Sequence, residues 1–307
     1  MFAFFPPRAG FAHDVEDMTS KLAFITGAAS GIGAALAKVL AQRDLSVVLA
    51  DRQYELAAEV AESICRSGGQ ARAVELDVRD AAGFERAVTE AVFHGGRIDY
   101  LFNNAGIGVA GEALHYELAD WYDVFDVNLR GVVHGVQAVY PLMCRQGFGH
   151  IINTSSMAGL IPTAEAASYT ATKHAVVGLS KGLRVEAAQH GVKVSVLCPG
   201  VVRTPILAGG KYGRLKFAPQ SETKLREIWE RFRPMDAEVF ARKVLRGVDR
   251  NAPIIVVPST WKLVWALERL SPSLALRACE WGHRHFREAM NPYRLDRRRR
   301  LRVVESS

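Results

Sequence analysis

The sequence contains few cysteines and no pattern of metal ligands. Its four cysteines (Cys65, Cys144, Cys198 and Cys279) are scattered over 307 residues, with no CxxC pair and no histidine cluster at ligand spacing. This distribution argues against structural zinc and against a disulfide framework, so we expect no metal. It fits a protein of the reducing cytoplasm.

Long hydrophobic runs are also missing. No uninterrupted apolar run reaches the roughly 18–20 residues that a membrane-spanning helix requires. The apolar start, MFAFFPPRAGF, contains two prolines and lacks the basic region and small-residue cleavage site of a secretory signal. We therefore expect a cytoplasmic protein in which residues 1–17 form a disordered N-terminal extension.

The net charge of +7 is unevenly distributed. From residue 277 to the end, nine arginines stand against four acidic residues, so +5 of the +7 belongs to the C-terminal tail. A charge run at a chain end is typical of a solvated segment. We expect no nucleic-acid partner, and contact with an anionic membrane is the alternative.

Short β-branched runs alternate with longer amphipathic stretches along most of the chain. Strand-like runs occur at 22–26, 46–50, 71–76, 100–103, 150–154, 193–197 and 254–257. Helix-like stretches occupy 33–42, 55–67, 81–93, 118–145, 169–190 and 236–250. The strands are continuous apolar runs, as in a parallel sheet covered on both faces. The pattern predicts a single α/β domain over residues 18–257, a Rossmann-like doubly wound parallel β-sheet with helices on both faces.

The first predicted strand ends in a glycine-rich loop, TGAASGIG, and a helix pattern follows at once. Glycine removes the Cβ that would block close approach of a pyrophosphate, and the helix N-terminus favours an anion. Strand, loop and helix in this order are the context of a dinucleotide-binding loop. Packing of the helix on the strand alone is the alternative. The residues that we expect to bind the cofactor are Gly27, Ser30, Gly31, Ile32 and Gly33.

Asp51 stands at the end of the second predicted strand, 24 residues beyond Gly27. A carboxylate at this place accepts hydrogen bonds from the adenosine ribose and repels a 2′-phosphate, which favours NAD. Arg52 follows immediately and could bind that phosphate, so NADP stays an alternative. A further alternative for Asp51 is a helix N-cap or a solvated loop acid.

The glycine spacing, followed by Asp77-Val78 and by the NNAG run at 103–106, resembles the short-chain dehydrogenase/reductase family in its compact branch. The resemblance extends from residue 19 to residue 257. It implies that Asp77 and Val78 contact the adenine. It also implies that the NNAG run borders the adenosine through Asn104, Ala105 and Gly106.

Tyr169 and Lys173 stand four residues apart in a predicted helix, so they project from the same face. A phenol has an ordinary pKa near 10, and a nearby ammonium together with an oxidised nicotinamide would lower it. A group that exchanges a proton near neutral pH is what alcohol–ketone interconversion requires. We expect Tyr169 to be the general acid and base, and Lys173 to lower its pKa and to bind the nicotinamide ribose.

The resemblance implies three further groups of site residues. Ser156, thirteen residues before Tyr169, matches the serine that holds the substrate oxygen, in a better register than Ser155. Asn128 matches a helix asparagine that helps to hold a water beside the lysine, and an asparagine bonded locally is the alternative. The loop that lines the nicotinamide matches Pro199, Gly200, Val202 and Thr204.

The loops expected to surround the substrate are apolar. They contain Ile107, Val109, Met157, Leu160, Ile161, Pro162, Ile206 and Leu207. The nearest cations, Lys211, Arg214 and Lys216, are expected to face water. We therefore expect hydride transfer between NAD(P) and a small lipophilic alcohol, ketone or aldehyde, in a homodimer or homotetramer. An epimerase or dehydratase on the same fold, or a nucleotide-binding protein without turnover, is the alternative.

Residues 204–235 interrupt the alternation of strands and helices. Leu225, Ile228, Trp229 and Phe232 fall on one helical face within this segment. We expect a lid that covers the substrate and excludes water. The alternative is that this face packs on the core or on a neighbouring subunit.

The C-terminal segment 258–307 is not required by the sheet. Residues 261–274 carry a broad apolar face, and Pro272 begins a second helix that leads into the arginine run at 297–300. Such a face with tryptophan at its edge suits an amphipathic helix at a membrane interface, so peripheral membrane contact is one expectation. The other is that the face packs over the active-site mouth or against a partner subunit.

Overall fold

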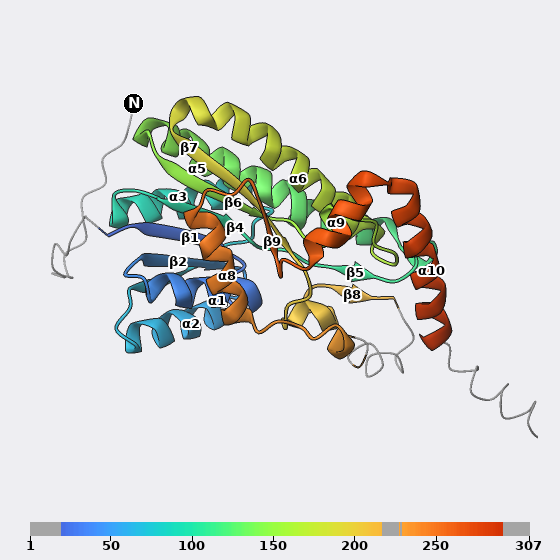
Figure 1. The fold of residues 1–307 in the computed structure, drawn as a ribbon. Helices are drawn as coiled ribbons and strands as arrows, with labels where there is room; N and C mark the ends of the chain where they lie inside the picture. The colour runs from blue at the N-terminus through green and yellow to red at the C-terminus, as the bar shows by residue number, and fades with distance from the viewer. Residues whose placement is uncertain (1–19, 217–226, 228, 291–307) are drawn as a thin grey trace, which may run out of the picture.

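A seven-stranded parallel β-sheet forms the centre of the molecule (Figure 1). The computed structural model describes residues 20–216, 227 and 229–290. In the sheet order β3-β2-β1-β4-β6-β7-β9, the strands are Ala71–Glu75, Ser46–Asp51, Leu22–Thr26, Tyr100–Asn103, Gly149–Thr154, Val192–Pro199 and Ile254–Val257. Every neighbouring pair is parallel. The predicted Rossmann-like, doubly wound sheet is confirmed.

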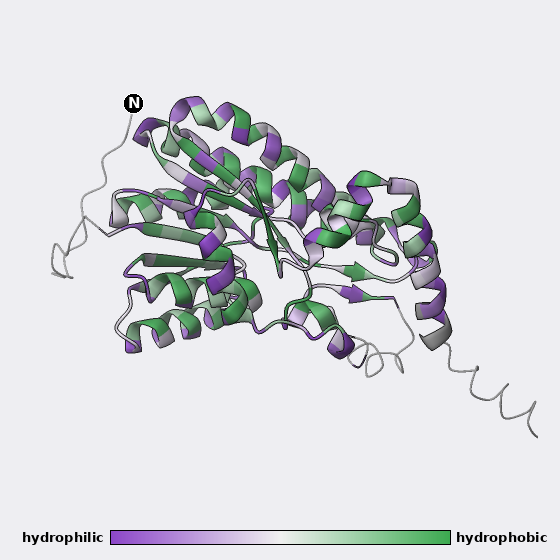
Figure 2. Cartoon of the chain, viewed as in Figure 1, coloured by the Kyte–Doolittle hydropathy of each residue, from purple (hydrophilic) through white to green (hydrophobic). Residues whose placement is uncertain are grey.

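Helices cover both faces of this sheet. One face carries α1 (Gly31–Ala41), α2 (Tyr54–Arg66) and α8 (Ala237–Asp249). The other carries α3 (Ala81–Gly95), α5 (Gly131–Gln146) and α6 (Ala167–Ala187). The strands are hydrophobic on both sides, and each helical layer encloses its own cluster of core residues (Figure 2). Burial on both faces explains why the strand sequences are continuous apolar runs.

The longest predicted helix, 118–145, is divided in the structure. α4 (Leu118–Phe125) leads into a π-helical turn at Asp126–Arg130, and α5 follows. The predicted helical stretch is therefore confirmed, and the π-turn within it was not predicted. Within the turn, the Asn128 Oδ1 accepts from the Ile107 N–H (2.8 Å) and the Nδ2 donates to the Ile107 carbonyl (2.9 Å). π-turns inside helices are frequent at functional sites.

The loops at the carboxyl edge of the sheet form a second, small sheet. β5 (Val109–Ala110) pairs in parallel with β8 (Arg214–Leu215), which follows a 3₁₀ turn at Pro205–Ala208. Neither strand was predicted, because two residues are too few to show a period. The pairing joins the loop after β4 to the segment after β7. This small sheet lies near the point between β1 and β4 where the strand order reverses. Ligands usually bind at such a point in sheets of this kind.

Two helices follow the last strand, as predicted. α9 (Trp261–Leu270) and α10 (Pro272–Met290) pack against each other beside β5 (Figure 1). Leu274, grouped with the first apolar face in the prediction, belongs to α10. Among the described residues, no helix combines the length and the apolar character needed to cross a membrane. The predicted extension 1–17 and the arginine run lie outside the described residues.

Candidate active site

A pocket of about 860 Å³ lies at the carboxyl edge of the sheet. Most residues predicted for the cofactor and the substrate line it. They are Gly27, Ser30, Gly31, Ile32, Asp51, Arg52, Asp77, Val78, Asn104, Ala105, Gly106, Ser156, Tyr169, Lys173, Pro199, Gly200, Val202 and Thr204. Two predicted residues, Gly33 and Asn128, lie behind the pocket wall instead. The sheet thus brings residues from six separate loops to one place.

The glycine loop approaches its neighbours too closely for side chains. Gly27 has a φ of +66°, and a Cβ there would lie 2.7 Å from the Ala105 Cα. A Cβ on Gly33 would collide with the Gly27 carbonyl oxygen. Asn104 fixes the loop, because its Nδ2 donates to the carbonyls of Thr26 (3.1 Å) and Gly27 (3.3 Å). The result is a cradle of bare backbone at the N-terminus of α1, which fits a dinucleotide diphosphate.

Asp51 lies at the pocket wall, with its carboxylate held by two backbone N–H groups. The Oδ2 accepts from Ala29 (2.9 Å) and the Oδ1 accepts from Gln53 (2.9 Å). Hydrogen bonds to an ionised carboxylate are among the stronger ones, so they fix its position. The residue is buried, and the N-cap of α2 is Gln53. Asp51 is therefore neither a helix cap nor a solvated loop acid.

Arg52 contacts two other residues that line the pocket. Its Nη1 lies 3.6 Å from the Asp77 Oδ2, and its guanidinium lies 4.2 Å from the centre of the Tyr212 ring. Arg79 also binds Asp77, with 2.6 Å between its Nη2 and the Oδ2. Hydrogen bonds from Arg79 hold the pKa of Asp77 below its usual value. Arg52 thus has two partners within the protein.

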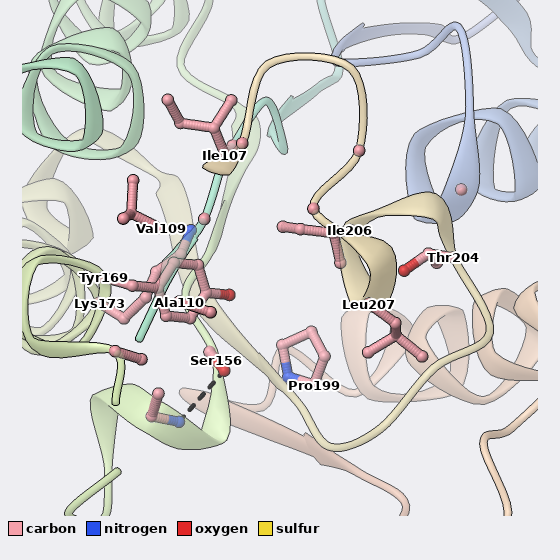
Figure 3. A pocket seen from close by; sticks show the side chains of 18 of the residues that line it. Ile107, Val109, Ala110, Ser156, Tyr169, Lys173, Pro199, Thr204, Ile206 and Leu207 are labelled. Atoms are coloured by element: carbon pink, nitrogen blue, oxygen red, sulfur yellow. Dashed lines mark hydrogen bonds between the residues drawn. The ribbon is translucent and has the colours of Figure 1, made fainter. Parts of the chain in front are cut away.

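Tyr169 and Lys173 extend from α6 into the pocket, near Ser156 (Figure 3). The Lys173 Nζ lies 5.3 Å from the centre of the Tyr169 ring and donates to the Thr154 carbonyl (3.0 Å). Burial lowers the pKa of Lys173 to about 8. Burial raises the pKa of Tyr169, and its hydrogen bond with Ser156 opposes that rise. Desolvation is the larger effect, so the pKa of Tyr169 lies above its usual value. The lowering expected from Lys173 and an oxidised nicotinamide together stays a prediction.

The two serines after β6 use their hydroxyls differently. Ser155 is buried, and its Oγ donates to the Lys173 carbonyl (2.7 Å). The Ser156 Oγ accepts from the Ala158 N–H (3.1 Å), and its hydroxyl meets that of Tyr169 inside the pocket. Ser156 is therefore the better placed of the two to meet a substrate oxygen.

Asn128 lies behind Lys173 and Gly106. It is fully buried, and a Cβ on Gly106 would lie 3.3 Å from its Oδ1 and 3.5 Å from the Lys173 Nζ. Its side chain bonds the backbone of Ile107, so it fixes the loop after β4 beside the lysine. Ile107 lies 21 residues away in the sequence, so Asn128 is not bonded locally within its own helix. Its part in holding a water beside the lysine stays a prediction.

Apolar side chains surround the space in front of Tyr169. Ile107, Val109, Ile206 and Leu207 are seen around it, together with Pro199 (Figure 3). Met157, Ile161 and Pro162 also line the pocket, whereas Leu160 is buried in the core. Seven of the eight apolar residues predicted for the substrate loops therefore reach the pocket.

The three cations near the substrate loops differ in their exposure and in their ion pairs. Lys211 is exposed, as predicted. Arg214 instead binds Asp120 (2.7 Å) and Asp123, and Lys216 binds Asp120 (2.8 Å). The prediction that Arg214 and Lys216 face water was wrong. The reason is that α4 presents the buried Asp120 to β8, a contact that no local sequence pattern shows.

The segment predicted to be a lid contributes two aromatic residues to the pocket. Trp229 and Phe232 line it, with 6.1 Å between their ring centres. Leu225 and Ile228, predicted on the same face, lie outside the described residues.

Comparison with known proteins identifies the family. The short chain dehydrogenase family model matches residues 21–211, more than half of the chain. The chain belongs to this family. It is an oxidoreductase with the family's nucleotide-binding Rossmann fold.

Three relatives illustrate the match. A 2,5-dichloro-2,5-cyclohexadiene-1,4-diol dehydrogenase from Sphingobium indicum is 40% identical over 191 residues, which are 62% of this chain and 76% of that protein. A short-chain dehydrogenase/reductase from Burkholderia phymatum in complex with NAD is 30% identical with a TM-score of 0.76, and the match covers 83% of this chain and 95% of that one. A metagenomic short-chain oxidoreductase in complex with NADP is 37% identical with a TM-score of 0.57, over 61% and 86% of the two chains.

The C-terminal helices of this short-chain dehydrogenase contribute residues to the pocket lining. These residues were not predicted individually from the sequence. Trp261 comes from α9, and Cys279, Gly282 and His283 come from α10. The last three share one helical face, a pattern that can be seen in the sequence but that does not show which surface the face meets. The inner side of the segment thus packs over the pocket, one of the two expectations for it.

Glu112, Glu165 and His283 each bring one ligand atom to within 4.8 Å of the others. Arg287 contacts Glu112, and the His283 Nε2 lies 3.0 Å from the Glu165 Oε1. Both carboxylates thus have partners within the protein, so the cluster is explained without a cation.

Proposed function

We propose that this protein is an NAD(P)-dependent dehydrogenase that interconverts a small lipophilic alcohol and its ketone or aldehyde. One observation carries the proposal. The phenol of Tyr169, the hydroxyl of Ser156 and the ammonium of Lys173 meet in a single pocket with the glycine cradle. Together these groups can hold a substrate oxygen and move its proton beside a bound dinucleotide.

Each residue has a distinct part in this reaction. Ser156 donates a hydrogen bond to the substrate oxygen, and Tyr169 takes the proton of the alcohol or returns it to the carbonyl. Lys173, with a pKa of about 8, keeps most of its charge at pH 7 and favours the phenolate. The nicotinamide, when bound, supplies the hydride acceptor and, in its oxidised form, a positive charge. Asn128 acts indirectly by holding the loop next to Lys173.

NAD is the proposed preference. The Asp51 carboxylate is fixed at the pocket wall, where it would accept from a ribose hydroxyl and repel a phosphate. Arg52, the residue that could bind that phosphate, already pairs with Asp77 and stacks on Tyr212. Solved relatives bind NAD in one case and NADP in another, so the argument rests on these side chains.

A lipophilic substrate is supported by the wall in front of Tyr169. Its side chains are apolar, and the cations Arg214 and Lys216 are paired with Asp120 and Asp123. A relative named for a chlorinated cyclohexadiene-diol is consistent with an apolar cyclic alcohol. We therefore propose a neutral alcohol or carbonyl compound, and not an acid or a phosphate ester.

Substitution of Tyr169 tests the proposal. Tyr169→Phe removes only the proton-transferring oxygen, so NADH binding should be unchanged while kcat with cyclic alcohols falls by about 100-fold or more. Tyr140→Phe, which alters a phenol of α5 away from the pocket, is the matched control and should turn over at the wild-type rate. A Tyr169→Phe enzyme with wild-type turnover would refute the assignment.

A further inference from the structure

The C-terminal helices have two different sides. On α9, Trp261 and Trp265 pack against the core. Leu263, Leu267 and Leu270 repeat at i, i+4 and i+7 on the other side of the helix. Leu263 and Leu270 are 77% and 85% exposed. An amphipathic helix on a protein surface normally turns a polar face outward, whereas α9 exposes leucines beside Lys262 and Arg269.

The second helix also has an exposed side that carries apolar residues. On α10, Cys279 and His283 line the pocket, whereas Leu274, Trp281 and Arg284 are exposed on the other side. Arg277 is exposed on the same side as Trp281 and Arg284, since these residues follow at i, i+4 and i+7. We call the set Leu263, Leu267, Leu270, Leu274, Trp281, Arg277 and Arg284 the outer face.

The charge of the chain is concentrated in the same segment. Residues 258–307 contain eleven basic and five acidic residues, a net charge of +6 out of +7 for the whole protein. An apolar surface that carries positive charge at its edge is complementary to an anionic lipid surface. Large apolar side chains enter the boundary between headgroups and acyl chains, and arginines bind the headgroups.

We propose that the outer face docks on an anionic lipid membrane. Docking would be peripheral, because no described helix is long and apolar enough to span a bilayer. A second copy of the chain is the less favourable occupant, since a two-fold contact would bring Arg277 and Arg284 of both copies together. The lipid surface neutralises that charge instead.

The proposal gives the pocket a position relative to the membrane. Trp261 on the inner side of α9 and His283 on the inner side of α10 both line the pocket. One layer of helix therefore separates the pocket from the outer face. This part of the argument rests on the proposed function, because only a lipophilic substrate would gain from a route out of the bilayer.

Flotation with defined vesicles tests the docking. Full-length protein is mixed with vesicles of phosphatidylcholine alone or of phosphatidylcholine with phosphatidylglycerol. We expect flotation with the anionic vesicles only, and a loss of binding as salt is raised, because salt screens the interaction. Leu263→Ser/Leu270→Ser should weaken partitioning by about tenfold or more, since two exposed leucines no longer bury apolar area. Arg277→Gln/Arg284→Gln should reduce the preference for anionic vesicles.

The matched control replaces two exposed apolar side chains by serine outside the C-terminal helices. Phe93→Ser/Val185→Ser replaces two apolar side chains of α3 and α6 that are 84% and 78% exposed, and it should float like the wild type. Equal binding by the two double variants, or protein that stays at the bottom with anionic vesicles, overturns the proposal. Self-association that the leucine substitutions abolish assigns the outer face to a second copy and also overturns it.

Turnover of a water-soluble alcohol is measured in parallel without vesicles. Activity without flotation rejects the docking and leaves the proposed function intact. Flotation without activity rejects the proposed function and supports the docking.

Discussion

The Nε2 of His283 lies 3.0 Å from the Oε1 of Glu165, and this contact joins α10 to the loop that leads into α6. The Glu165 side chain is 10% exposed, and its Oε2 has no hydrogen-bond partner within the described part of the chain. Glu165 also has a φ of +58°, which residues other than glycine rarely adopt. The pair thus holds an unusual loop conformation against a helix that follows it by 118 residues.

Removal of the histidine should destabilise the fold. In His283→Ala the buried Glu165 carboxylate loses its partner, and we expect the free energy of unfolding to fall by about 1–3 kcal/mol. Chemical denaturation measures it. His285→Ala, on an exposed histidine of the same helix, is the control and should have little effect.

The double variant Glu165→Leu/His283→Ala separates this contact from a general effect on α10. It should recover much of the lost stability, because the buried charge is gone. If the stability losses of Glu165→Leu and His283→Ala simply add up to that of the double variant, the two residues are not coupled.

Lys173 should make stability depend on pH in a defined window. Its pKa is lowered by burial from 10.5 to about 8, so between these values the unfolded chain binds more protons than the folded one. Stability therefore rises with pH across this window, by up to about 3 kcal/mol from this group. In Lys173→Met the contribution is absent.

The measurement is the difference in unfolding free energy between wild type and Lys173→Met, taken without cofactor at several pH values. We expect the unfolding free energy of the wild type to increase relative to that of Lys173→Met as pH rises from about 8 to about 10.5. A difference that stays constant over that range would show that Lys173 titrates normally in the fold.

Asp51 should determine the choice of cofactor. Asp51→Ala removes both the ribose acceptor and the repulsion of a 2′-phosphate, so the ratio of kcat/KM for NAD to that for NADP should fall on the order of 10–1000-fold. Arg52→Ala is the companion variant, and it should change the ratio little because Arg52 pairs with Asp77. A ratio governed by Arg52 instead would contradict the assignment.

Trp229 tests whether the segment 204–235 acts as a lid. We predict that Trp229→Ala raises KM for large lipophilic alcohols more than for short ones, since the indole lines the pocket. The comparison is a series of alcohols of increasing chain length. An unchanged profile along that series would mean that Trp229 only packs on the core.

The pocket residues of the glycine loop and seven of the eight apolar loop residues could be placed from the sequence, whereas those of α9 and α10 could not. Gly27, Asp51 and Tyr169 each lie at a fixed distance from a strand or a helix turn, so local spacing is enough to place them. His283 and Glu165 are far apart in the sequence and meet only through the packing of α10. Asp120 and Arg214 pair across two elements, one of them a two-residue strand. Tertiary contacts of this kind leave no period in the sequence.

The order of these parts along the chain has a consequence for how the enzyme can change. The family model ends at residue 211, and Trp261, Cys279 and His283 all follow the last strand of the sheet. A mutation or insertion after Val257 can therefore alter the pocket wall that α9 and α10 contribute, while the glycine loop and Tyr169 stay unchanged. Changes in this last stretch can reshape one wall of the pocket, while Ile107, Val109 and Ile206 keep the rest of the apolar wall within the family's common segment.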